Sequence, residues 1–406
     1  MKAHLNKVLI LGHSYLATEN RKQLNALARH VNVVVLSPRR WHEGMTQFDI
    51  DADRVEDRQK IIHFAREYRF PYLPHSQYVL PGLRKAVKSI KPDLIHIESD
   101  PWTTFAMQMI LVRNSLDRKI PIVCTAKQNT YTRRGQLIDA LKKSIGKWGI
   151  RNVARFIAVS DAVPDLYARH FNLPVQYFDR NTHLGVDTEL FYPVNQKEKN
   201  MKRRHWLPNN HNPETFLVGY CGRLEEYKGI SDLVEAIRRV QKKTSLDLKL
   251  LMLGNGSMKE HLDDLRKRES FIHLFSQVPH SAVAGFMKSL DLFIMPARKT
   301  KDHEEHDAHA VIEALACGLH CIGTDSGAIP DVIGDAGTIV PSQDLTELSR
   351  AIGSHISRFS DQKNEIPEFN VKGRNRAEKN FSLDAVARKN LNTYIMATEE
   401  WNKRTG

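Results

Sequence analysis

The sequence reads Lys7-Val8-Leu9-Ile10-Leu11-Gly12 at its first apolar run, which predicts a buried strand. Residues 20–29 follow with apolar side chains at helical spacing, and residues 31–36 form a second, β-branched run. The same alternation continues through apolar runs at residues 93–97, 121–125 and 155–160. Near-continuous apolar strands separated by helices are typical of a parallel sheet covered on both faces. We therefore predict a doubly wound α/β domain at the start of the chain.

A second alternating series begins after a break in this pattern. Residues 192–214 are polar and charged and contain three prolines, as expected of a linker. The apolar runs then resume at residues 216–221, 248–253, 271–275, 290–295, 320–324 and 337–341. We predict two doubly wound domains of similar size, residues 1–193 and 194–382, facing each other across a cleft. Ligands of such domains bind beyond the carboxyl ends of the strands.

The composition limits the class of protein. Of 406 residues, 41% are hydrophobic and 26% are charged, which is typical of a soluble globular protein. No stretch approaches the roughly 18 consecutive apolar residues that a membrane span requires, and the apolar part of the N-terminus is too short for a signal peptide. The four cysteines suggest neither a disulfide framework nor the paired spacing of a metal site. We expect a cytoplasmic protein.

Basic residues are concentrated in the first half of the chain. The net charge is +13, and residues 1–190 hold 29 Lys and Arg against 18 Asp and Glu. Residues 118–155 contain ten Lys and Arg and a single acid, with an apolar stripe of Leu137, Ile138, Leu141, Ile145 and Trp148. A basic amphipathic helix with Trp indicates an anionic membrane surface as a partner. The alternative is an ordinary helix whose apolar face packs on the sheet. A nucleic-acid partner is not expected, because no nucleic-acid motif accompanies the charge.

Two strand ends of the second series carry groups that suit phosphates. Gly222-Arg223 follows the run at 216–221, and Lys228 lies five residues further on. The fork of donors on Arg223 and the point charge of Lys228 together suit a diphosphate, although a solvated loop could hold the same charges. Gly254 follows the next run, where a glycine lets a ligand approach the backbone or simply makes a turn.

Two carboxylates stand out in the segment 296–318. Glu305 lies at the junction between a charged loop and a helix, and Glu313 lies two turns further within the apolar pattern of that helix. A carboxylate among apolar residues is unfavourable unless it faces a polar ligand, and a pair of sugar hydroxyls would fit. The alternative is a capping acid together with a surface glutamate.

These residues resemble a known family. Glu305 and Glu313 fit the E-x7-E signature of retaining GT-B glycosyltransferases, and the surrounding sequence is similar to glycosyltransferase family 4. The resemblance extends through residues 157–160, 185–187, 222–228 and 323–337. It implies a GT-B fold of two Rossmann-like domains, with the last helix, within residues 383–406, crossing back onto the N-terminal domain. It also implies that this domain binds the acceptor.

The resemblance also implies residue roles. Arg223 and Lys228 would hold the diphosphate of the donor with the N-terminus of the helix that begins near Ala308, Glu313 would bind the ribose, and Glu305 would bind the transferred sugar. Other donor-binding residues would be Gly222, Gly254, Gln277, Val278, His309, Ala310 and Val311. No metal or other cofactor is implied, because cations and helix dipoles neutralise the leaving diphosphate.

The sequence departs from the family in several places. His13-Ser14-Tyr15 stands where a glycine-rich loop is common, and Lys127-Gln128 stands near a usual histidine. Asp307-Ala308 replaces the usual Phe-Gly within E-x7-E, beside His309. His96 ends a strand at the same predicted edge. The acceptor-side candidates are therefore His13, Tyr15, His96, Lys127 and Gln128.

We thus expect a retaining, metal-independent hexosyltransferase of polysaccharide biosynthesis. Its donor would be a nucleoside diphosphate sugar, preferably a UDP-hexose, and its acceptor a glycan, a lipid-linked intermediate or a polysaccharide precursor. The basic segment would place it at the inner face of the membrane. The alternatives are a GT-B nucleotide-sugar epimerase and a non-catalytic protein that binds sugar nucleotides.

Overall fold

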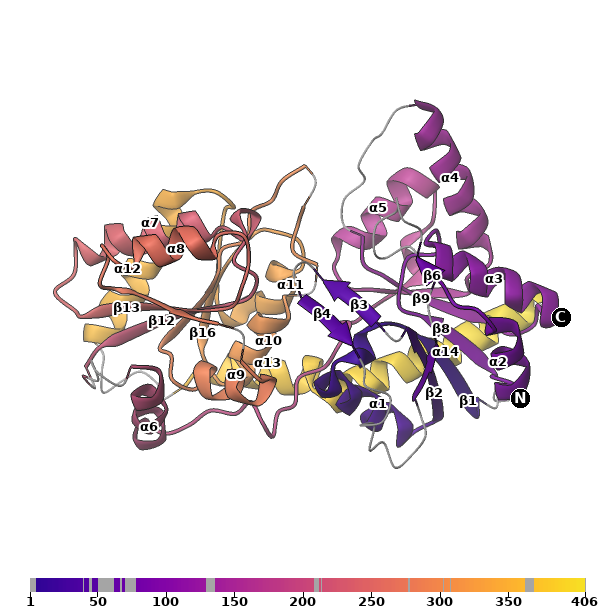
Figure 1. Ribbon diagram of the computed structural model, residues 1–406, viewed down its shortest axis with the longest axis horizontal. Helices are drawn as coiled ribbons and strands as arrows, with labels where there is room; N and C mark the ends of the chain where they lie inside the picture. Colours follow the sequence, from indigo (N-terminus) through magenta and orange to yellow (C-terminus); the bar gives the residue numbers. More distant parts are fainter. Residues whose placement is uncertain are drawn as a thin grey trace. The chain divides into compact units, whose positions relative to one another are not determined.

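The computed structural model describes residues 5–38, 40–43, 46–49, 62–65, 68–69, 78–128, 136–207, 212, 214–276, 278–301, 303–306, 308–361 and 369–405 (Figure 1). The chain forms two compact units, Met1–Gly185 with Leu383–Gly406, and Val186–Ser382. We call these unit 1 and unit 2. The division after Gly185 precedes the predicted boundary at 193–194, because Val186 and Phe191 belong to unit 2. The N–H of Val186 donates to the Phe381 carbonyl at 2.7 Å, and Phe191 is fully buried in the core of unit 2.

Unit 1 contains a parallel sheet of seven strands in the order β11-β10-β9-β8-β1-β2-β5. The predicted apolar runs form five of these strands: β1 (Lys7–Leu11), β2 (Asn32–Pro38), β8 (Leu94–Ile97), β9 (Ile122–Ala126) and β10 (Arg155–Ala158). The outer strands β5 (Ile62–Ala65) and β11 (Phe178–Arg180) were not predicted. Two short antiparallel pairs, β3 (Arg40–Glu43) with β4 (Thr46–Asp49) and β6 (Tyr68–Arg69) with β7 (Tyr78–Val79), complete the strands described in this unit.

Helices cover both faces of this sheet. One apolar cluster joins the sheet to α2 (Leu83–Ile90), α3 (Thr104–Leu116) and α5 (Ala162–Phe171), and Trp148 of α4 (Gln136–Arg151) packs against it. A second cluster joins the sheet to α1 (Arg21–Ala28) and α14 (Leu383–Thr405).

The last helix is an integral part of unit 1, as the resemblance implied. The indole N–H of Trp401 donates to the Arg118 carbonyl at 2.8 Å, and the Asn181 side chain donates to that of Asn390 at 2.7 Å. The fold of unit 1 therefore requires residues from both ends of the chain.

Unit 2 contains a parallel sheet of six strands in the order β14-β13-β12-β15-β16-β17. All six correspond to predicted apolar runs: β12 (Phe216–Cys221), β13 (Leu248–Leu253), β14 (Ile272–Phe275), β15 (Leu292–Met295), β16 (His320–Thr324) and β17 (Thr338–Val340). Figure 1 shows α7 (Ile230–Gln241), α8 (Lys259–Leu265) and α12 (Leu345–Asp361) on one face. The other face carries α9 (His280–Met287), α10 (His309–Ala316) and α13 (Val371–Phe381), and α11 (Ile329–Ile333) follows β16. The predicted doubly wound α/β class is confirmed for both units.

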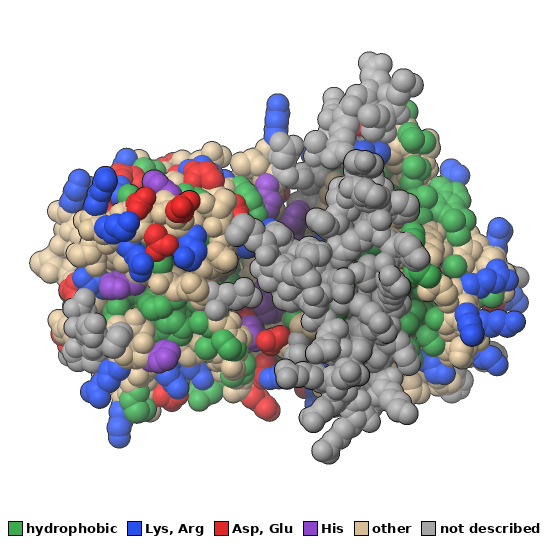
Figure 2. Space-filling model, in the orientation of Figure 1, with side chains coloured by type: hydrophobic (Ala, Val, Ile, Leu, Met, Phe, Trp, Pro, Cys, Tyr) green, Lys and Arg blue, Asp and Glu red, His purple; other side chains and the backbone are tan. Residues whose placement is uncertain are grey.

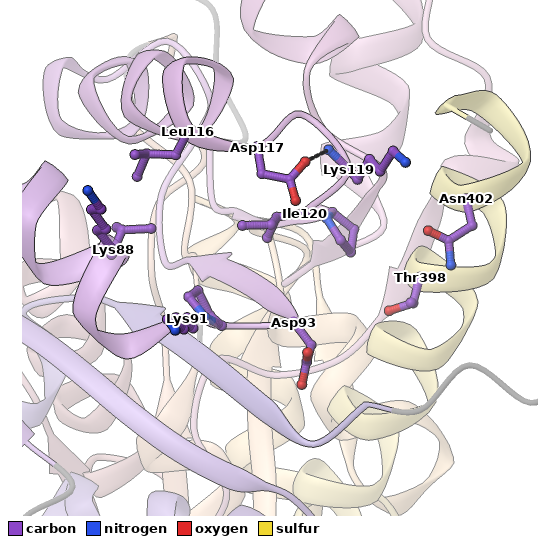
Figure 3. A pocket seen from close by; sticks show the side chains of 12 residues that line it. Lys88, Lys91, Asp93, Leu116, Asp117, Lys119, Ile120, Thr398 and Asn402 are labelled. Carbon is purple, nitrogen blue, oxygen red and sulfur yellow. Dashed lines mark hydrogen bonds between the residues drawn. The ribbon is translucent and has the colours of Figure 1, made fainter.

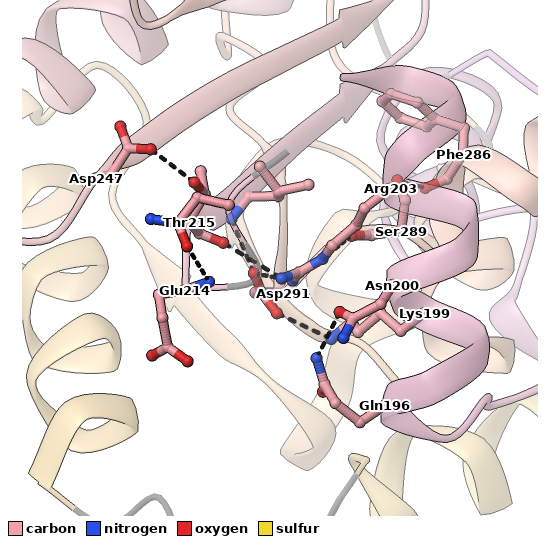
Figure 4. A network of polar contacts seen from close by, with 12 residues as sticks. Gln196, Lys199, Asn200, Arg203, Glu214, Thr215, Asp247, Phe286, Ser289 and Asp291 are labelled. Carbon is pink, nitrogen blue, oxygen red and sulfur yellow. Dashed lines mark hydrogen bonds and ion pairs between the residues drawn. The ribbon is translucent and has the colours of Figure 1, made fainter. Parts of the chain in front are cut away.

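The segment predicted as a linker contains a docked helix, α6 (Gln196–Trp206), which the sequence pattern did not indicate (Figure 4). Asn195 caps this helix by accepting from the Glu198 N–H at 2.9 Å. Arg203, which is 3% exposed, forms an ion pair with Asp291, and the Lys199 ammonium lies 2.9 Å from the same carboxylate. Burial alone would raise the pKa of Asp291, but these two cations hold it below its usual value. The helix therefore belongs to unit 2.

Candidate functional site

Two glycines bring the loops after β12 and β13 close together. The N–H of Gly222 donates to the Leu253 carbonyl at 3.0 Å. A Cβ on Gly254 would lie 1.8 Å from the Gly222 carbonyl oxygen, which no real side chain tolerates. Both positions were predicted to contact the donor, and Gly254 has this structural requirement as well. The close approach fixes the loop that carries Arg223 at the carboxyl edge of the sheet.

The two predicted cations lie near one aromatic ring. The short helix η5 (Glu226–Lys228) follows the β12 loop and ends at Lys228. The Arg223 guanidinium lies 5.6 Å from the ring centroid of Tyr227, and the Lys228 ammonium lies 5.7 Å from it. Arg223 is exposed, whereas Lys228 is buried. One cation is therefore open to a ligand from solvent and the other is held inside.

Lys228 and Glu305 form a buried ion pair. The ammonium nitrogen lies 2.5 Å from Glu305 Oε2, and each residue is 8% exposed. Burial would raise the pKa of Glu305, but the charge of Lys228 outweighs it and holds the pKa below its usual value. The carboxylate is thus ionised at neutral pH at the carboxyl edge of the sheet.

The backbone of Glu305 is clamped by the loop after β16. The Glu305 N–H donates to Ser326 Oγ at 3.2 Å, and its carbonyl accepts from the Ala328 N–H at 2.9 Å. Gly327 lies between them with a φ of 53°, and a Cβ there would lie 1.9 Å from the Glu305 carbonyl oxygen. Glycine is required at this position both for its φ and for the close approach. The clamp holds the Glu305 backbone in place beside Lys228.

The second carboxylate, Glu313, lies one turn inside α10 and is paired with histidines. His280 Nε2 lies 2.6 Å from Glu313 Oε1, and His309 Nε2 lies 3.6 Å from the same oxygen. His280 begins α9, so the pairing joins two helices that the chain order separates. His280 was not among the predicted site residues.

The start of α10 is positioned by Ala308, whose φ of 42° is left-handed. The N–H of Val311 is bonded to the Ala308 carbonyl at 2.9 Å, and the Val311 side chain is fully buried in the core. The Val311 side chain is thus part of the core, and a contact of this residue with the donor stays a prediction. Ala310 is partly buried against the same core, and His309 stands at the first position of the helix.

Three further positions singled out from the sequence are the predicted donor contacts Gln277 and Val278 and the departure Asp307. Val278 is partly buried and packs against the core of unit 2. Gln277 and Asp307 lie outside the described residues. His303, which was not predicted, lies against Tyr227 with the two rings tilted and their centroids 4.1 Å apart. Burial and the neighbouring Lys228 charge lower the pKa of His303 to about 4, so the ring is neutral at physiological pH.

Unit 1 holds a separate polar cluster at the carboxyl ends of β1, β8 and β9. The Tyr15 hydroxyl donates to Glu98 Oε1 at 2.5 Å. His183 Nε2 lies 3.8 Å from Glu98 Oε2, 2.6 Å from Ser14 Oγ and 3.1 Å from the Lys127 ammonium. Burial raises the pKa of Glu98, although Lys127 opposes this shift. Tyr15 and Lys127 were predicted here, whereas Glu98 and His183 were not.

The remaining acceptor-side candidates differ in their support. His13 is half-buried beside this cluster, and its pKa is lowered well below its usual value by burial and then by the Lys127 charge. Gln128 is half-buried, and its backbone hydrogen-bonds to Asp100. The structure corrects the assignment of His96 to the acceptor side. Its two ring nitrogens lie 2.7 Å from Thr125 Oγ1 and 2.8 Å from the Tyr394 hydroxyl. Both nitrogens are thus engaged within the core, which leaves His96 a packing role.

A cavity of about 620 Å³ lies at the opposite, amino edge of the unit 1 sheet (Figure 3). Its lining includes Lys88, Lys119 and Thr398. On the face seen in Figure 2, basic side chains stand together at the edge of unit 1 that carries α2, whereas both signs intermix over unit 2. The Asp93 carboxylate at this cavity already accepts the Lys7 N–H at 2.8 Å. The cavity is therefore distinct from the polar clusters at the carboxyl edges.

Two doubly wound parallel sheets, the second with paired cations and the carboxylates Glu305 and Glu313 at its carboxyl edge, define the GT-B class of glycosyltransferases. Known proteins agree with this class. Residues 203–365 match the family model of glycosyl transferases group 1, and residues 21–180 match that of glycosyltransferase family 4. The chain belongs to this family of glycosyltransferases.

Individual relatives are distant. The 2-deoxystreptamine N-acetyl-D-glucosaminyltransferase of Streptomyces fradiae is 22% identical over 384 residues, covering 80% of this chain and 89% of the relative. The capsular polysaccharide biosynthesis glycosyltransferase CapM of Staphylococcus aureus is 26% identical, covering 63% of this chain and 67% of the relative.

Solved structures share the whole fold. A glycosyltransferase from Rickettsia africae superposes with a TM-score of 0.70 at 18% identity, covering 96% of this chain and 98% of that one. HepE of Anabaena, solved in complex with UDP and glucose, superposes with a TM-score of 0.66 at 14% identity, covering 96% of this chain and 99% of that one. Within the described part of the chain, no helix has the length and apolar character needed to cross a bilayer.

Proposed function

We propose that this glycosyltransferase moves a hexose from a UDP-hexose to a glycan, lipid-linked or polysaccharide-precursor acceptor, with retention of the anomeric configuration. The observation that carries the proposal is the buried Lys228–Glu305 pair beside Arg223 at the carboxyl edge of the unit 2 sheet. HepE, which shares the fold, is described with UDP and glucose. That complex favours UDP over other nucleotides as the first donor to test.

The charges suit the departure of a diphosphate. As the bond between the sugar and the diphosphate breaks, negative charge develops on the phosphate oxygens. Arg223, exposed beside Tyr227, offers several N–H donors, and the preorganised charge of Lys228 stands behind it. We assign the diphosphate to these two cations and to the N-terminus of α10. Because the cations supply the neutralisation, the proposed transfer needs no bound metal.

Glu313 and Glu305 would each bind one of the two sugars of the donor, the ribose and the transferred hexose. Glu313 is 4% exposed as a side chain and would accept hydrogen bonds from the ribose hydroxyls. Glu305 lies against Lys228 and would accept from hydroxyls of the transferred hexose. In the proposed retaining step, the acceptor hydroxyl attacks from the face that the diphosphate leaves. The proton of this hydroxyl passes to an oxygen of the leaving diphosphate. The two cations neutralise the remaining negative charge of the diphosphate.

The acceptor would bind at the polar cluster of unit 1. Glu98, Tyr15, His183 and Lys127 meet there at the carboxyl edge of the sheet, where ligands of doubly wound domains bind. Carboxylate, phenol and imidazole groups suit a hydroxylated acceptor. The relative CapM is named for capsular polysaccharide biosynthesis, which favours a glycan acceptor.

A peripheral position at the inner face of the membrane is proposed from the basic segment. On α4, Lys143 and Lys147 are exposed and Leu141 is 62% exposed, which suits an anionic lipid surface. Trp148, by contrast, packs partly against the unit 1 core. Trp148 is therefore not part of a membrane-facing stripe. The side chains of Leu137 and Ile138 lie outside the described part of the chain.

The test is a donor screen followed by product analysis. The purified chain is heated with UDP-glucose, UDP-N-acetylglucosamine or GDP-mannose, each at a range of concentrations. A donor at 100 times its Kd stabilises the native state by about 2.7 kcal/mol. The matched control is Arg223→Ala, an exposed position whose loss should remove the stabilisation without unfolding the protein. Stabilisation by none of the donors contradicts the proposal.

Product analysis then separates the remaining alternatives. Nuclear magnetic resonance of the product, formed with a glycan acceptor, reports the anomeric configuration. An inverted anomer contradicts the retaining step, and an epimerised free donor supports the epimerase instead. A donor that stabilises the chain but is never cleaved supports a non-catalytic binder.

A further inference from the structure

His280, His309 and Glu313 form a compact group of donor atoms in unit 2. Each residue offers one ligand atom, and these atoms all lie within 4.8 Å of one another. The nitrogens come from the first residues of α9 and α10, and the oxygen lies one turn into α10. His309 and Glu313 are four residues apart, so they share one face of the helix. The group is therefore held by two elements of regular structure.

The spacing is close to what a transition metal requires. Zinc binds imidazole nitrogens and carboxylate oxygens at about 2.0–2.2 Å, so tetrahedral donors lie about 3.4 Å apart. The two nitrogens lie 2.6 and 3.6 Å from Glu313 Oε1. Small side-chain rotations would bring all three donors to one ion. Two imidazoles with one carboxylate also match the ligand types that zinc and its neighbours prefer.

A hydrogen bond explains only half of this arrangement. The 2.6 Å contact of His280 is an ordinary charge-assisted hydrogen bond. The 3.6 Å separation of His309 is too long for one. The other ring nitrogen of His309, Nδ1, is buried and has no hydrogen-bond partner among the described residues. The His309 imidazole thus lies beside the Glu313 carboxylate, and no hydrogen bond among the described residues explains this position.

The group is also accessible. The side chains of His280 and His309 are 31% and 29% exposed, whereas that of Glu313 is 4% exposed. The carboxylate is therefore held inside, and the imidazoles form the open side through which an ion and a water ligand can enter.

We propose that His280, His309 and Glu313 bind a divalent transition-metal ion of the zinc class, with a fourth position open to water. The order of affinities for such donor sets favours Zn²⁺, Cu²⁺ and Ni²⁺ over Mn²⁺. One consequence rests on the proposed function. Because Glu313 is assigned to the ribose of the donor, the bound ion and the donor nucleoside compete for the same carboxylate. The ion is then an inhibitor of the transferase and not part of its chemistry.

The direct test is calorimetric titration of the metal-free, full-length chain with Zn²⁺. His280→Ala and His309→Ala should each weaken the strongest binding event by at least about tenfold, the lower end of the range for a disturbed metal site. His303→Ala is the matched control, because His303 is a partly buried histidine of the same unit outside the group. Circular dichroism confirms that each variant is folded. Equal Zn²⁺ affinity in wild type and both variants, or an equal loss in the control, overturns the proposal.

A second titration separates this proposal from the function on which its consequence rests. Uridine lacks the diphosphate that would itself chelate Zn²⁺, so its affinity is measured with and without saturating Zn²⁺. Zn²⁺ binding that leaves uridine affinity unchanged upholds the metal site and contradicts the ribose role of Glu313. Absence of Zn²⁺ binding overturns the metal site and leaves the proposed transferase function intact.

Discussion

Replacing Lys228 with methionine separates the structural and catalytic roles of the buried pair. Methionine keeps the length and apolar stem of lysine but removes the charge. Glu305 then remains 8% exposed with no ammonium beside it. Breaking a buried ion pair by removing one partner costs about 3–5 kcal/mol, because the other charge stays buried. In a unit of this size we expect the midpoint of thermal unfolding to fall by about 6–20 °C.

The loss of stability in Lys228→Met should depend on pH, and the direction of this dependence can be predicted. Lys228 holds the pKa of Glu305 below its usual value against the opposing effect of burial. Without Lys228, burial is the largest remaining influence, opposed only by the smaller effects of His306 and His303. We therefore expect the pKa of Glu305 in the folded variant to rise above its unfolded value. A carboxyl of that kind destabilises the native state as the pH rises through the unfolded pKa, near 4.3. The deficit of Lys228→Met is therefore largest at neutral pH and shrinks towards pH 4.

The double variant Lys228→Met/Glu305→Gln distinguishes stability from activity. It removes both charges, and replacing a buried pair by neutral groups of similar size is often close to neutral for stability. Its free energy of unfolding should therefore recover most of the loss. Its kcat/KM should stay at least about 10²–10³-fold below wild type, because a preorganised charge at the diphosphate is still missing.

The assays are thermal unfolding followed by circular dichroism and release of nucleoside diphosphate from the best donor. Lys299→Met is the matched control, since Lys299 pairs with Glu304 at 3.5 Å on the same loop but its side chain is 55% exposed. Because the Lys299 side chain is open to solvent, loss of this longer pair should change stability by less than about 1 kcal/mol. Wild-type stability and wild-type turnover in Lys228→Met would refute the reasoning.

Three further predictions follow from other parts of the molecule. Glu313→Ala should weaken binding of the free nucleoside diphosphate, measured by calorimetry, while Glu305→Gln should chiefly lower turnover of the intact donor; the opposite pattern would show that the two roles are exchanged. Arg203→Ala should destabilise unit 2 by about 3 kcal/mol in urea unfolding, the lower end for a broken buried pair because a second cation remains. Since the pKa of Asp291 is depressed in the folded chain, the stabilisation from this pair is fully present above about pH 4 and is lost as the pH falls further; a deficit that does not shrink in acid would contradict the role of the ion pair. Vesicles with anionic lipid should bind the protein at low salt and release it at high salt, because exposed charges are screened within about 8 Å at physiological ionic strength. Neutral vesicles are the control, and equal binding to both, or no loss on changing three lysines to glutamate, would contradict a membrane role for Lys142, Lys143 and Lys147.

The central strands of both sheets could be predicted from the sequence because they are buried on both faces. The runs at 216–221, 248–253 and 320–324 coincide with β12, β13 and β16 residue by residue. Strands of this kind are mostly apolar, and short apolar runs between helical patterns leave few alternatives. The outer strand β11, Phe-Asp-Arg, has no such constraint, and its sequence carries no comparable signal.

The helix α6 was missed for a related reason. Its sequence, residues 196–206, is dominated by charged and polar side chains, as in a linker. Two buried side chains dock it: Trp206 packs into the core of unit 2, and the Arg203 guanidinium forms an ion pair with Asp291 far along the chain. A long-range ion pair of this kind has no local signature in the sequence.

The residues of the candidate site also fall into those that the sequence could indicate and those that it could not. Arg223, Lys228, Glu305 and Glu313 lie in or beside sequence motifs, so spacing and family resemblance could identify them. The partners that complete the geometry come from distant segments. His280 meets Glu313 across 33 positions, and His183 meets Ser14 across 169. Only the fold brings such residues together, which is why sequence reasoning omitted His280, Glu98 and His183.

The most direct test of the proposed activity is release of the nucleoside diphosphate from a nucleotide-sugar donor in the presence of a glycan acceptor. The wild-type chain is compared with Lys228→Met/Glu305→Gln, which should fold but lack the site. We predict that the wild type releases UDP from a UDP-hexose and that the acceptor gains one hexose, while the double variant is at least about 10²-fold slower. Equal release by both proteins, or release by neither from any donor, would contradict the assignment of this site to glycosyl transfer.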